Sequence, residues 1–340
     1  MKKLRVAIIG SGFGQYGLLP AFRSIPECEV VALCGKKRQQ LVDYCTATHF
    51  DFQKIYADWR TLLKKEHPDA LALAVTPRGQ YQIASHAIKQ GIHIFAEKPL
   101  AINLSQAKKL RSLATRYRVV HGIDFIFPEI PEWEEAKKII HERTYGSLRH
   151  ISTEWDFLSY DIRNRASTWK TDAKEGGGAL SFFFSHGLYY LENFAGKITK
   201  TKSICTYSPE SINGAETGVD IVFTSKTGVT GAAHISCNTR GITRHKVTLY
   251  CEHATITLEN RDSVVDNFTL EIHTEDSVKR IQPRTRRSRH GEDPRVKTVE
   301  KIAGRFVRAC LHKTSMTPSF KNGVSVQTII DTVRKESKKM

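Results

Sequence analysis

Short apolar runs alternate with amphipathic stretches over the first third of the chain. Residues 5–10, 30–34, 70–75 and 93–96 are rich in Val, Ile, Leu and Ala on both faces, which is typical of strands buried in a parallel sheet. The alternation predicts a doubly wound α/β domain with right-handed crossovers. Residues 118–121 would form its last strand. The helices of this domain are expected over residues 15–24, 37–48, 58–66, 79–90 and 103–117.

The pattern changes after about residue 122. Helices are expected over 132–143 and 179–195, and two more over 298–311 and 324–337. Between them, short alternating runs separated by Gly and polar residues indicate antiparallel hairpins. The strands are expected near residues 148–157, 200–207, 218–225, 229–237, 245–250, 253–258 and 267–273. The sequence thus predicts two domains: an α/β domain over 1–121, and an α+β domain with a large, open, mostly antiparallel sheet over 122–340.

Length and composition agree with two folded domains. The chain has 340 residues, of which 40% are hydrophobic and 26% charged. Its apolar runs are too short for a membrane span or a secretory signal, so neither is expected. The seven cysteines are scattered without a Cys-x-x-Cys pair, which predicts free thiols in a reducing cytoplasm and no metal site.

The charge balance is strongly basic, with 52 Lys and Arg against 35 Asp and Glu, a net charge of +17. Such a charge suggests nucleic acid, anionic membrane or a phosphorylated ligand. The zinc-finger, RNA-binding and interleaved aromatic patterns of nucleic-acid binders are missing, which favours a phosphate-bearing small molecule. The segment 279–297 has eight basic and two acidic residues. It is either a solvated loop or a loop over the substrate that holds a phosphate or carboxylate.

A glycine-rich turn follows the first predicted strand. Gly10, Gly12, Phe13 and Gly14 stand between that strand and a helix, where glycines allow a tight turn and a close approach of backbone to pyrophosphate. Gln15 replaces the third small residue of the usual fingerprint. A purely structural turn is the alternative, but the position after the first strand favours a dinucleotide-binding site.

The end of the second strand bears on which dinucleotide binds. An acidic residue at this place would bond the ribose hydroxyls of NAD. The chain instead has Gly35 and Lys36, followed by Lys37 and Arg38. These cations favour the 2′-phosphate of NADP, and a solvated basic helix start is the alternative reading.

Two further residues are candidates for proton transfer. Lys98, in Glu97-Lys98-Pro99, follows the strand 93–96 at the edge where open α/β sheets bind ligands, although an isolated surface charge is the alternative. His186 follows three glycines on a predicted helix, on one face with Phe182, Tyr189 and Tyr190. That face could equally belong to the core.

Taken together, these motifs resemble the Gfo/Idh/MocA oxidoreductases, the glucose–fructose oxidoreductase and inositol dehydrogenase family. The resemblance covers nearly the whole chain. Its motifs are Gly10–Gly14 with Leu19-Pro20-Ala21, Thr76-Pro77, Glu97-Lys98-Pro99-Leu100, Trp169-Lys170-Thr171-Asp172, Gly176–Leu180 with His186, and Pro318–Gly323 with Val326-Gln327.

The resemblance implies a Rossmann domain and an open-sheet domain through which homodimers or homotetramers form. It also implies hydride transfer between NADP or NAD and a sugar, nucleotide sugar or related polyol or keto-sugar, which could be phosphorylated. Lys98 and His186 would be the catalytic residues. Thr76, Pro77, Glu97 and Lys98 would contact the cofactor. Lys98 and His186 would also contact the substrate, together with Trp169, Lys170, Asp172 and Tyr189.

One departure from the family pattern is Phe182. Many members have Asp four residues before the histidine, where a carboxylate would orient the imidazole and stabilise its charged form. Two mechanisms therefore stay open: His186 acts without a carboxylate, or Lys98 transfers the proton alone or with a Tyr. A non-catalytic sensor or assembly protein of the same fold is the alternative function.

Overall fold

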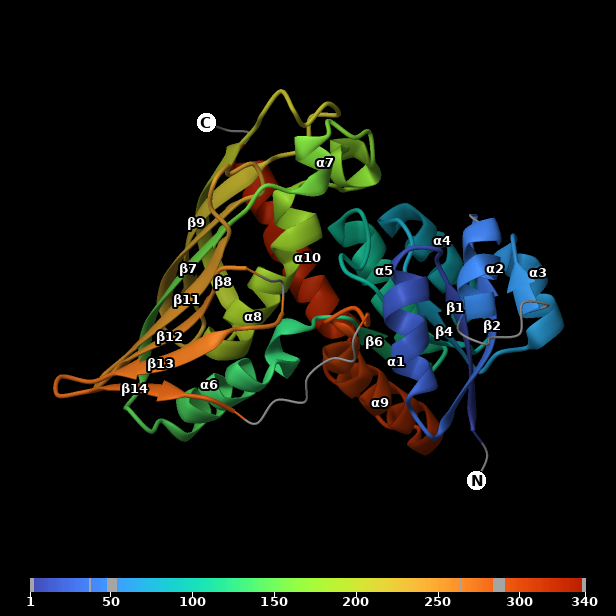
Figure 1. Ribbon diagram of the computed structural model, residues 1–340, viewed down its shortest axis with the longest axis horizontal. Coiled ribbons are helices and arrows are strands. Elements are labelled where there is room, and N and C mark those ends of the chain that lie inside the picture. The colour runs from blue at the N-terminus through green and yellow to red at the C-terminus, as the bar shows by residue number, and fades with distance from the viewer. Residues whose placement is uncertain (1–2, 37, 48–53, 263–264, 284–290, 338–340) are drawn as a thin grey trace. The chain divides into compact units, whose positions relative to one another are not determined.

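The fold is described from a computed structural model, for residues 3–36, 38–47, 54–262, 265–283 and 291–337. Contacts within the chain divide it into two compact units, each described by itself here (Figure 1). The first unit comprises Met1–Ile126 and Arg287–Val324. The second comprises Phe127–Arg286 and Ser325–Met340.

The first unit is built on a six-stranded sheet in the order β3-β2-β1-β4-β5-β6, with every neighbouring pair parallel. This is the strand order of a Rossmann fold, and it confirms the predicted α/β class. The last strand was predicted too early, because Arg118 has φ +53° and lies outside the extended region. The strands are β1 (Leu4–Ile9), β2 (Cys28–Cys34), β3 (Ile55–Tyr56), β4 (Ala70–Leu73), β5 (His93–Ala96) and β6 (His121–Ile123).

Helices of this unit pack in pairs against the sheet. α1 lies beside α9, and α4 lies beside α5 (Figure 1). The helix expected from residue 15 begins as a π-helical turn over Gly14–Leu18 and continues into α1. The helices are α1 (Leu19–Arg23), α2 (Arg38–Ala47), α3 (Trp59–Glu66), α4 (Pro77–Ile88), α5 (Leu104–Arg116) and α9 (Val296–His312).

An eight-stranded sheet forms the second unit, in the order β14-β13-β12-β11-β7-β10-β9-β8. All neighbouring pairs are antiparallel except β7 with β10, so the predicted mostly antiparallel sheet is confirmed. β14 was not predicted, since its Val-Lys-Arg-Ile sequence does not alternate. The strands are β7 (Leu148–Asp156), β8 (Ile198–Thr206), β9 (Gly218–Ser225), β10 (Thr230–Ser236), β11 (Arg244–Cys251), β12 (Thr255–Asn260), β13 (Thr269–His273) and β14 (Val278–Ile281).

Helices cover one face of this sheet (Figure 1). α6 packs on β12 and β13, α8 packs on β7, and α10 contacts β8 through the Ser203 hydroxyl. The predicted helix 179–195 is divided, because a π-helical turn over Ala179–Phe183 precedes α8. The helices are α6 (Pro131–Glu142), α7 (Tyr160–Arg163), α8 (Ser185–Ala195) and α10 (Phe320–Ser337).

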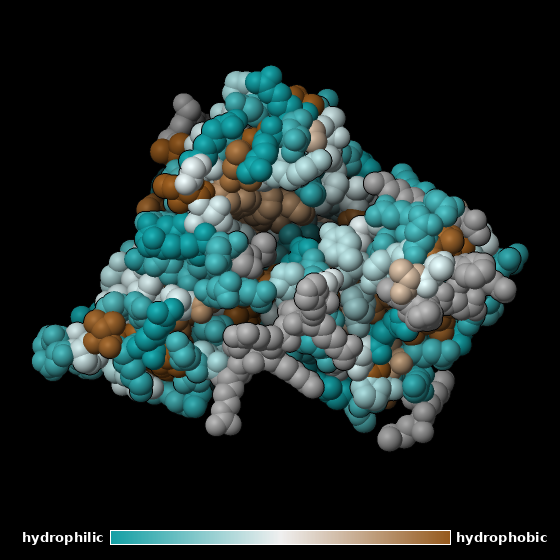
Figure 2. Space-filling model, in the orientation of Figure 1, coloured by the Kyte–Doolittle hydropathy of each residue, from teal (hydrophilic) through white to brown (hydrophobic). Residues whose placement is uncertain are grey.

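Aromatic rings fill the core between these helices and the sheet. Trp133, Tyr190 and Phe127 are buried there, and the His245 ring stacks on Trp155 with 4.3 Å between ring centroids. On the outside, hydrophilic residues predominate on the face shown in Figure 2, and hydrophobic ones form small patches. Among the described helices, none is long and apolar enough to cross a bilayer. All seven cysteines are free thiols, as predicted.

Candidate functional site

The glycine-rich turn lies at the carboxyl end of β1, where the sequence predicts a dinucleotide. Gly10 has φ +141°, and a Cβ there would collide with the Ala74 carbonyl oxygen at the end of β4, so this position requires glycine. Gly12 has no atom within 4 Å of where its Cβ would stand. The backbone at Gly12 is therefore open to a ligand, while Gly10 shapes the turn.

Residues from neighbouring strands surround this turn. Gly35, buried just after β2, packs against Ser11, and Lys36 beside it is exposed. Lys37 and the side chain of Arg38 lie outside the described residues. Thr76 uses its hydroxyl to cap α4, accepting a hydrogen bond from the Gly79 N–H at 3.3 Å, and Pro77 is the first residue of that helix.

A buried glutamine, which the sequence analysis did not single out, holds the Glu97–Lys98 turn after β5. The Gln80 amide nitrogen donates to the carbonyls of Glu97, Pro99 and Leu100 at 2.8–3.1 Å. Its oxygen accepts from the Glu97 N–H at 3.0 Å. The backbone that carries half-buried Lys98 is thus fixed by four hydrogen bonds to one side chain. A polar residue in the otherwise apolar face of α4 is the feature that could have revealed it.

Beside this turn, a second carboxyl group was also missed. Asp124 follows β6 and is 1% exposed, and its N–H donates to the Ala96 carbonyl at 2.9 Å. Burial raises the pKa of Asp124, and the charge of Glu97 raises it further. Burial likewise raises the pKa of Glu97, against the lowering effect of Lys98. A lone Asp within the apolar run of residues 122–127 is the sequence feature that marks this position.

Arg295, just before α9, reaches the glycine-rich turn from a distant part of the chain. Its guanidinium carbon lies 4.3 Å from the centroid of the Phe13 ring. Its Nη2 pairs with the Asp293 carboxylate at 2.7 Å. Burial lowers the pKa of Arg295, but the hydrogen bonds and charge of Asp293 outweigh it and raise the pKa overall. A permanent cation therefore lies on the ring of Phe13.

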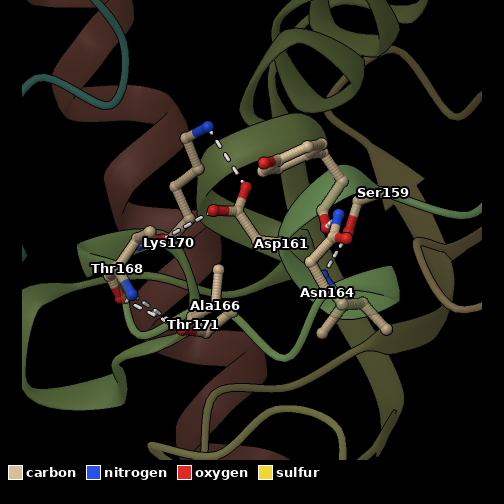
Figure 3. Close-up of polar contacts among 9 residues, drawn as sticks. Ser159, Asp161, Asn164, Ala166, Thr168, Lys170 and Thr171 are labelled. Atoms are coloured by element: carbon tan, nitrogen blue, oxygen red, sulfur yellow. Dashed lines mark hydrogen bonds and ion pairs between the residues drawn. The ribbon is translucent and has the colours of Figure 1, made fainter.

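The remaining predicted residues lie in the second unit. Trp169-Lys170-Thr171 forms a short 3₁₀ turn, and the Lys170 amine pairs with buried Asp161 at 3.2 Å (Figure 3). Thr168 donates to the other Asp161 oxygen at 3.0 Å. Asp161, which the sequence analysis did not name, thus fixes the lysine.

The Asp172 carboxylate and the backbone at Gly177 both contact other parts of the same loop. The Asp172 carboxylate accepts from the Lys174 N–H at 2.8 Å and caps the next turn. A Cβ at Gly177 would collide with the carbonyls of Trp169 and Lys170. The close backbone approach that Gly177 permits is therefore made by the chain's own loop.

His186 lies in α8 and is 7% exposed. Its ring packs edge-on against Phe127 with 5.3 Å between centroids, and Tyr189 and Tyr190 are buried beside it. Phe182 belongs to the preceding π-helical turn and packs on Trp169 with 5.2 Å between ring centroids. The single helical face expected for Phe182 and His186 is wrong, because the π-helical turn breaks the 3.6-residue period between them.

The basic segment 279–297 is not one continuous loop in the described part of the chain. Lys279 and Arg280 lie in β14, whereas Arg295 and Lys297 lie at the start of α9, each in an ion pair. Arg284, Arg286, Arg287 and Arg289 lie outside the described residues.

Comparisons with known proteins agree with this architecture. Residues 4–125 match the model of an oxidoreductase family with an NAD-binding Rossmann fold, and residues 133–257 match the Gfo/Idh/MocA C-terminal domain. The chain belongs to the Gfo/Idh/MocA family of oxidoreductases. The family resemblance inferred from the motifs is thereby confirmed.

Individual members of the Gfo/Idh/MocA family are similar over nearly the whole chain. An uncharacterized oxidoreductase of Synechocystis sp. is 25% identical over 96% of this chain and 92% of its own. Among solved structures, levoglucosan dehydrogenase in complex with NADH and levoglucosan has a TM-score of 0.86 at 18% identity, over 99% of this chain and 98% of that one. A 3-ketoreductase from Actinomadura kijaniata with NADP has a TM-score of 0.82 at 17% identity, over 98% of each.

This Gfo/Idh/MocA chain is an oxidoreductase whose Rossmann unit binds a nicotinamide dinucleotide. The residues present fit that cofactor. The backbone is open at Gly12, the glycine at position 10 keeps the turn tight, and Lys98 follows β5 on the ligand-binding edge of the same sheet.

Proposed function

We propose that the protein transfers a hydride between NADP, in preference to NAD, and a carbon of a sugar, nucleotide sugar or related polyol or keto-sugar. The bound nicotinamide supplies the hydride chemistry, and the protein supplies binding, orientation and proton transfer. The family match supports the reaction type, and the sugar substrates named for similar proteins support the substrate class.

The observation that carries this proposal is the rigid turn around Lys98. β5 pairs with β4, and β4 pairs with β1, so Lys98 and the glycine-rich turn share the carboxyl edge of one sheet. Gln80 fixes the backbone on either side of the lysine. An amine carried by a fixed backbone at this edge suits a group that accepts the hydroxyl proton during oxidation and returns it during reduction.

His186 is proposed to assist through its imidazole, without the carboxylate that other members have four residues earlier. Tyr189 is the other candidate for this assistance. Trp169 would present an apolar ring to the C–H face of a sugar, while Asp161 and Asp172 keep the turn around Lys170 in place. The alternative function, a non-catalytic nucleotide sensor or assembly protein, would bind cofactor without turning over any sugar.

The NADP preference rests on Lys36 and Arg38, which replace the acidic residue that binds the NAD ribose. Titration of protein fluorescence with NADPH and NADH tests it. The double variant Lys36→Glu/Arg38→Glu should bind NADPH at least about tenfold more weakly, which is about 1.4 kcal/mol, and NADH no more weakly.

A matched control is the double variant Lys64→Glu/Lys65→Glu, which makes the same charge change on the exposed side of α3 in the same unit. It should leave both affinities unchanged. Equal weakening of NADPH and NADH in the Lys36/Arg38 variant would contradict the preference. A turnover assay over aldoses, polyols, keto-sugars and their phosphates, in both directions, then identifies the substrate class.

A further inference from the structure

Two carboxyl groups with buried oxygens follow neighbouring strands at the turn that carries Lys98. Glu97 and Asp124 follow β5 and β6, and the strand register pairs Ala96 with Ile123, so the two acidic residues succeed paired positions. Corresponding positions of paired parallel strands point their side chains to the same face, so the two carboxyl groups are neighbours. The Oε1 of Glu97 and the Oδ1 of Asp124 are both buried, and neither accepts a hydrogen bond within the described part of the chain.

A hydrogen bond between two carboxyl groups requires a proton on one of them, because an ionised carboxylate only accepts. Two negative charges in buried contact also repel strongly, so such pairs hold one proton between them. The pKa values of Glu97 and Asp124 are both raised, in keeping with this. The neighbouring positions of the two carboxyl groups and the burial of their oxygens therefore favour a pair that carries one negative charge.

When the Glu97–Asp124 pair holds one proton, its negative charge equals the positive charge of Lys98. Lys98 and Arg295 are the cations that act on both carboxyl groups, and Arg295 is already paired with Asp293 through two hydrogen bonds of 2.7 and 2.9 Å. A single negative charge on the Glu97–Asp124 pair then matches Lys98. A second one would hold Lys98 in its charged form and hinder the loss of its proton.

We propose that Asp124 is a positioning residue that shares one proton with Glu97, so that the pair presents a single negative charge to Lys98. Once Lys98 has lost its own proton to solvent, its neutral amine can accept the substrate hydroxyl proton, as one O–H bond breaks and one N–H bond forms, while the proton of the pair stays in place. Only the role given to Lys98 rests on the proposed function. Asp124 acts through Lys98 and need not touch the substrate.

Amide variants test this charge state. Glu97→Gln and Asp124→Asn each leave one carboxylate beside a neutral partner of similar shape, which reproduces a pair with one proton. The double variant removes the charge. Competitive acetylation of Lys98 by acetic anhydride across a pH range, followed by mass spectrometry, reports the pH at which half of the amine is deprotonated, and exposed Lys108 is the internal control.

The single variants should keep the wild-type midpoint for Lys98, and the double variant should lower it by about one pH unit or more, with Lys108 unchanged. A lower midpoint in either single variant would mean that both carboxyls are ionised in the wild type. An unchanged midpoint in the double variant would mean that the pair does not act on Lys98. Either result overturns the proposal.

A second measurement starts from the wild-type protein. The infrared spectrum of the wild-type protein near pH 8 should contain the C=O stretching band of a protonated carboxyl group, and Asp124→Asn should remove it. A wild-type spectrum without the band overturns the proposal. Both measurements are made without cofactor or substrate. A failure of hydride transfer would therefore overturn the proposed function without changing what they show about the charge of the Glu97–Asp124 pair.

Discussion

Lys98 can be altered without disturbing the turn that carries it. Gln80 holds this turn through backbone groups of Glu97, Pro99 and Leu100, and none of those bonds involves the lysine amine. The role of the side chain can therefore be separated from that of its backbone.

Replacing Lys98 by Met keeps the length of the side chain and removes its proton-transfer group. We expect kcat to fall by about 10²–10⁴-fold, the contribution of a general acid–base group, while the melting temperature stays within a few degrees. Steady-state kinetics and thermal unfolding measure the two effects. Unchanged kcat would remove Lys98 from the mechanism, and Lys108→Met, at an exposed position of the same unit, controls for the lost charge.

His245 predicts how the stability of the second unit depends on pH. Its ring is buried against Trp155, within 3.1 Å of the Tyr190 hydroxyl, and burial lowers its pKa to about 3. The unfolded chain binds a proton near pH 6.5 that the folded one excludes, so stability is lost as the pH falls below 6.5 towards about 3.

Between pH 7 and pH 5, this histidine should cost about 2 kcal/mol of unfolding free energy, and His245→Gln should lose correspondingly less over the same interval. Urea unfolding at the two pH values measures the difference. Equal losses in wild type and variant would contradict a neutral His245. His141→Gln, at an exposed position of α6 in the same unit, is the matched control.

Residues with a local motif could be predicted from the sequence, whereas those that act through tertiary contacts could not. Gly10, Gly12 and Lys98 were named because each stands at a strand end in a recognisable pattern. Asp124 and Gln80 have no such pattern, since their importance arises from strand pairing and from a helix that faces the turn. The catalytic and binding roles assigned to the named residues stay predictions.

Among the elements, the turn between β1 and the following π-helical turn has two glycines with different roles. Gly10 gives the turn its shape, and Gly12 leaves room for the ligand. A Cβ at Gly12 would meet nothing within 4 Å, whereas one at Gly10 would collide with Ala74. Gly12→Ala should keep the melting temperature and weaken NADPH binding by about tenfold or more, because the methyl group occupies space that the pyrophosphate approaches.

Gly10→Ala is the paired variant, and it should lower the melting temperature, since alanine is strained at a φ of +141°. Differential scanning calorimetry and cofactor titration of both variants complete the test. Wild-type affinity in Gly12→Ala would place the dinucleotide away from this turn.

Periodicity predicted most elements but not their breaks. The helix expected over residues 179–195 is correct in extent, yet the π-helical turn at Ala179–Phe183 changes which side chains share a face. The collision that a Cβ at Gly177 would make with the Trp169 loop shows that tertiary contact, not local propensity, governs the start of this helix. The two-residue strand β3 is too short to produce a pattern at all.

At the scale of the whole molecule, the sequence predicted two folds but not how the chain divides between them. Residues Arg287–Val324 follow the strands of the second unit and yet belong to the first, where α9 packs beside α1. The amphipathic pattern of α9 predicts a buried face without naming the partner that covers it.

The predicted homodimer or homotetramer remains a proposal, supported by apolar side chains on the uncovered face of the eight-stranded sheet. Ile204 in β8 is 58% exposed and Val222 in β9 is 56% exposed. The double variant Ile204→Glu/Val222→Glu should convert an oligomer to a monomer. It should keep its fold, because these exposed side chains do not pack in the core.

Light scattering coupled to size-exclusion chromatography measures the molar mass of the wild type and the double variant in solution. Ile242→Glu, at an equally exposed position outside the strands, should leave the mass unchanged. A monomeric wild type, or an oligomeric double variant, would contradict an interface through this sheet.

The transfer of label from cofactor to substrate tests directly whether the protein transfers a hydride to a sugar carbon. NADPH carrying deuterium at the transferable C4 position is incubated with the protein and a panel of keto-sugars, and the products are examined by mass spectrometry. We expect deuterium on one carbon of a sugar product with the wild type, and a loss of that product with Lys98→Met at an NADPH concentration that saturates the variant. A wild-type protein that binds NADPH and yet labels no sugar in the panel would contradict the proposed hydride transfer.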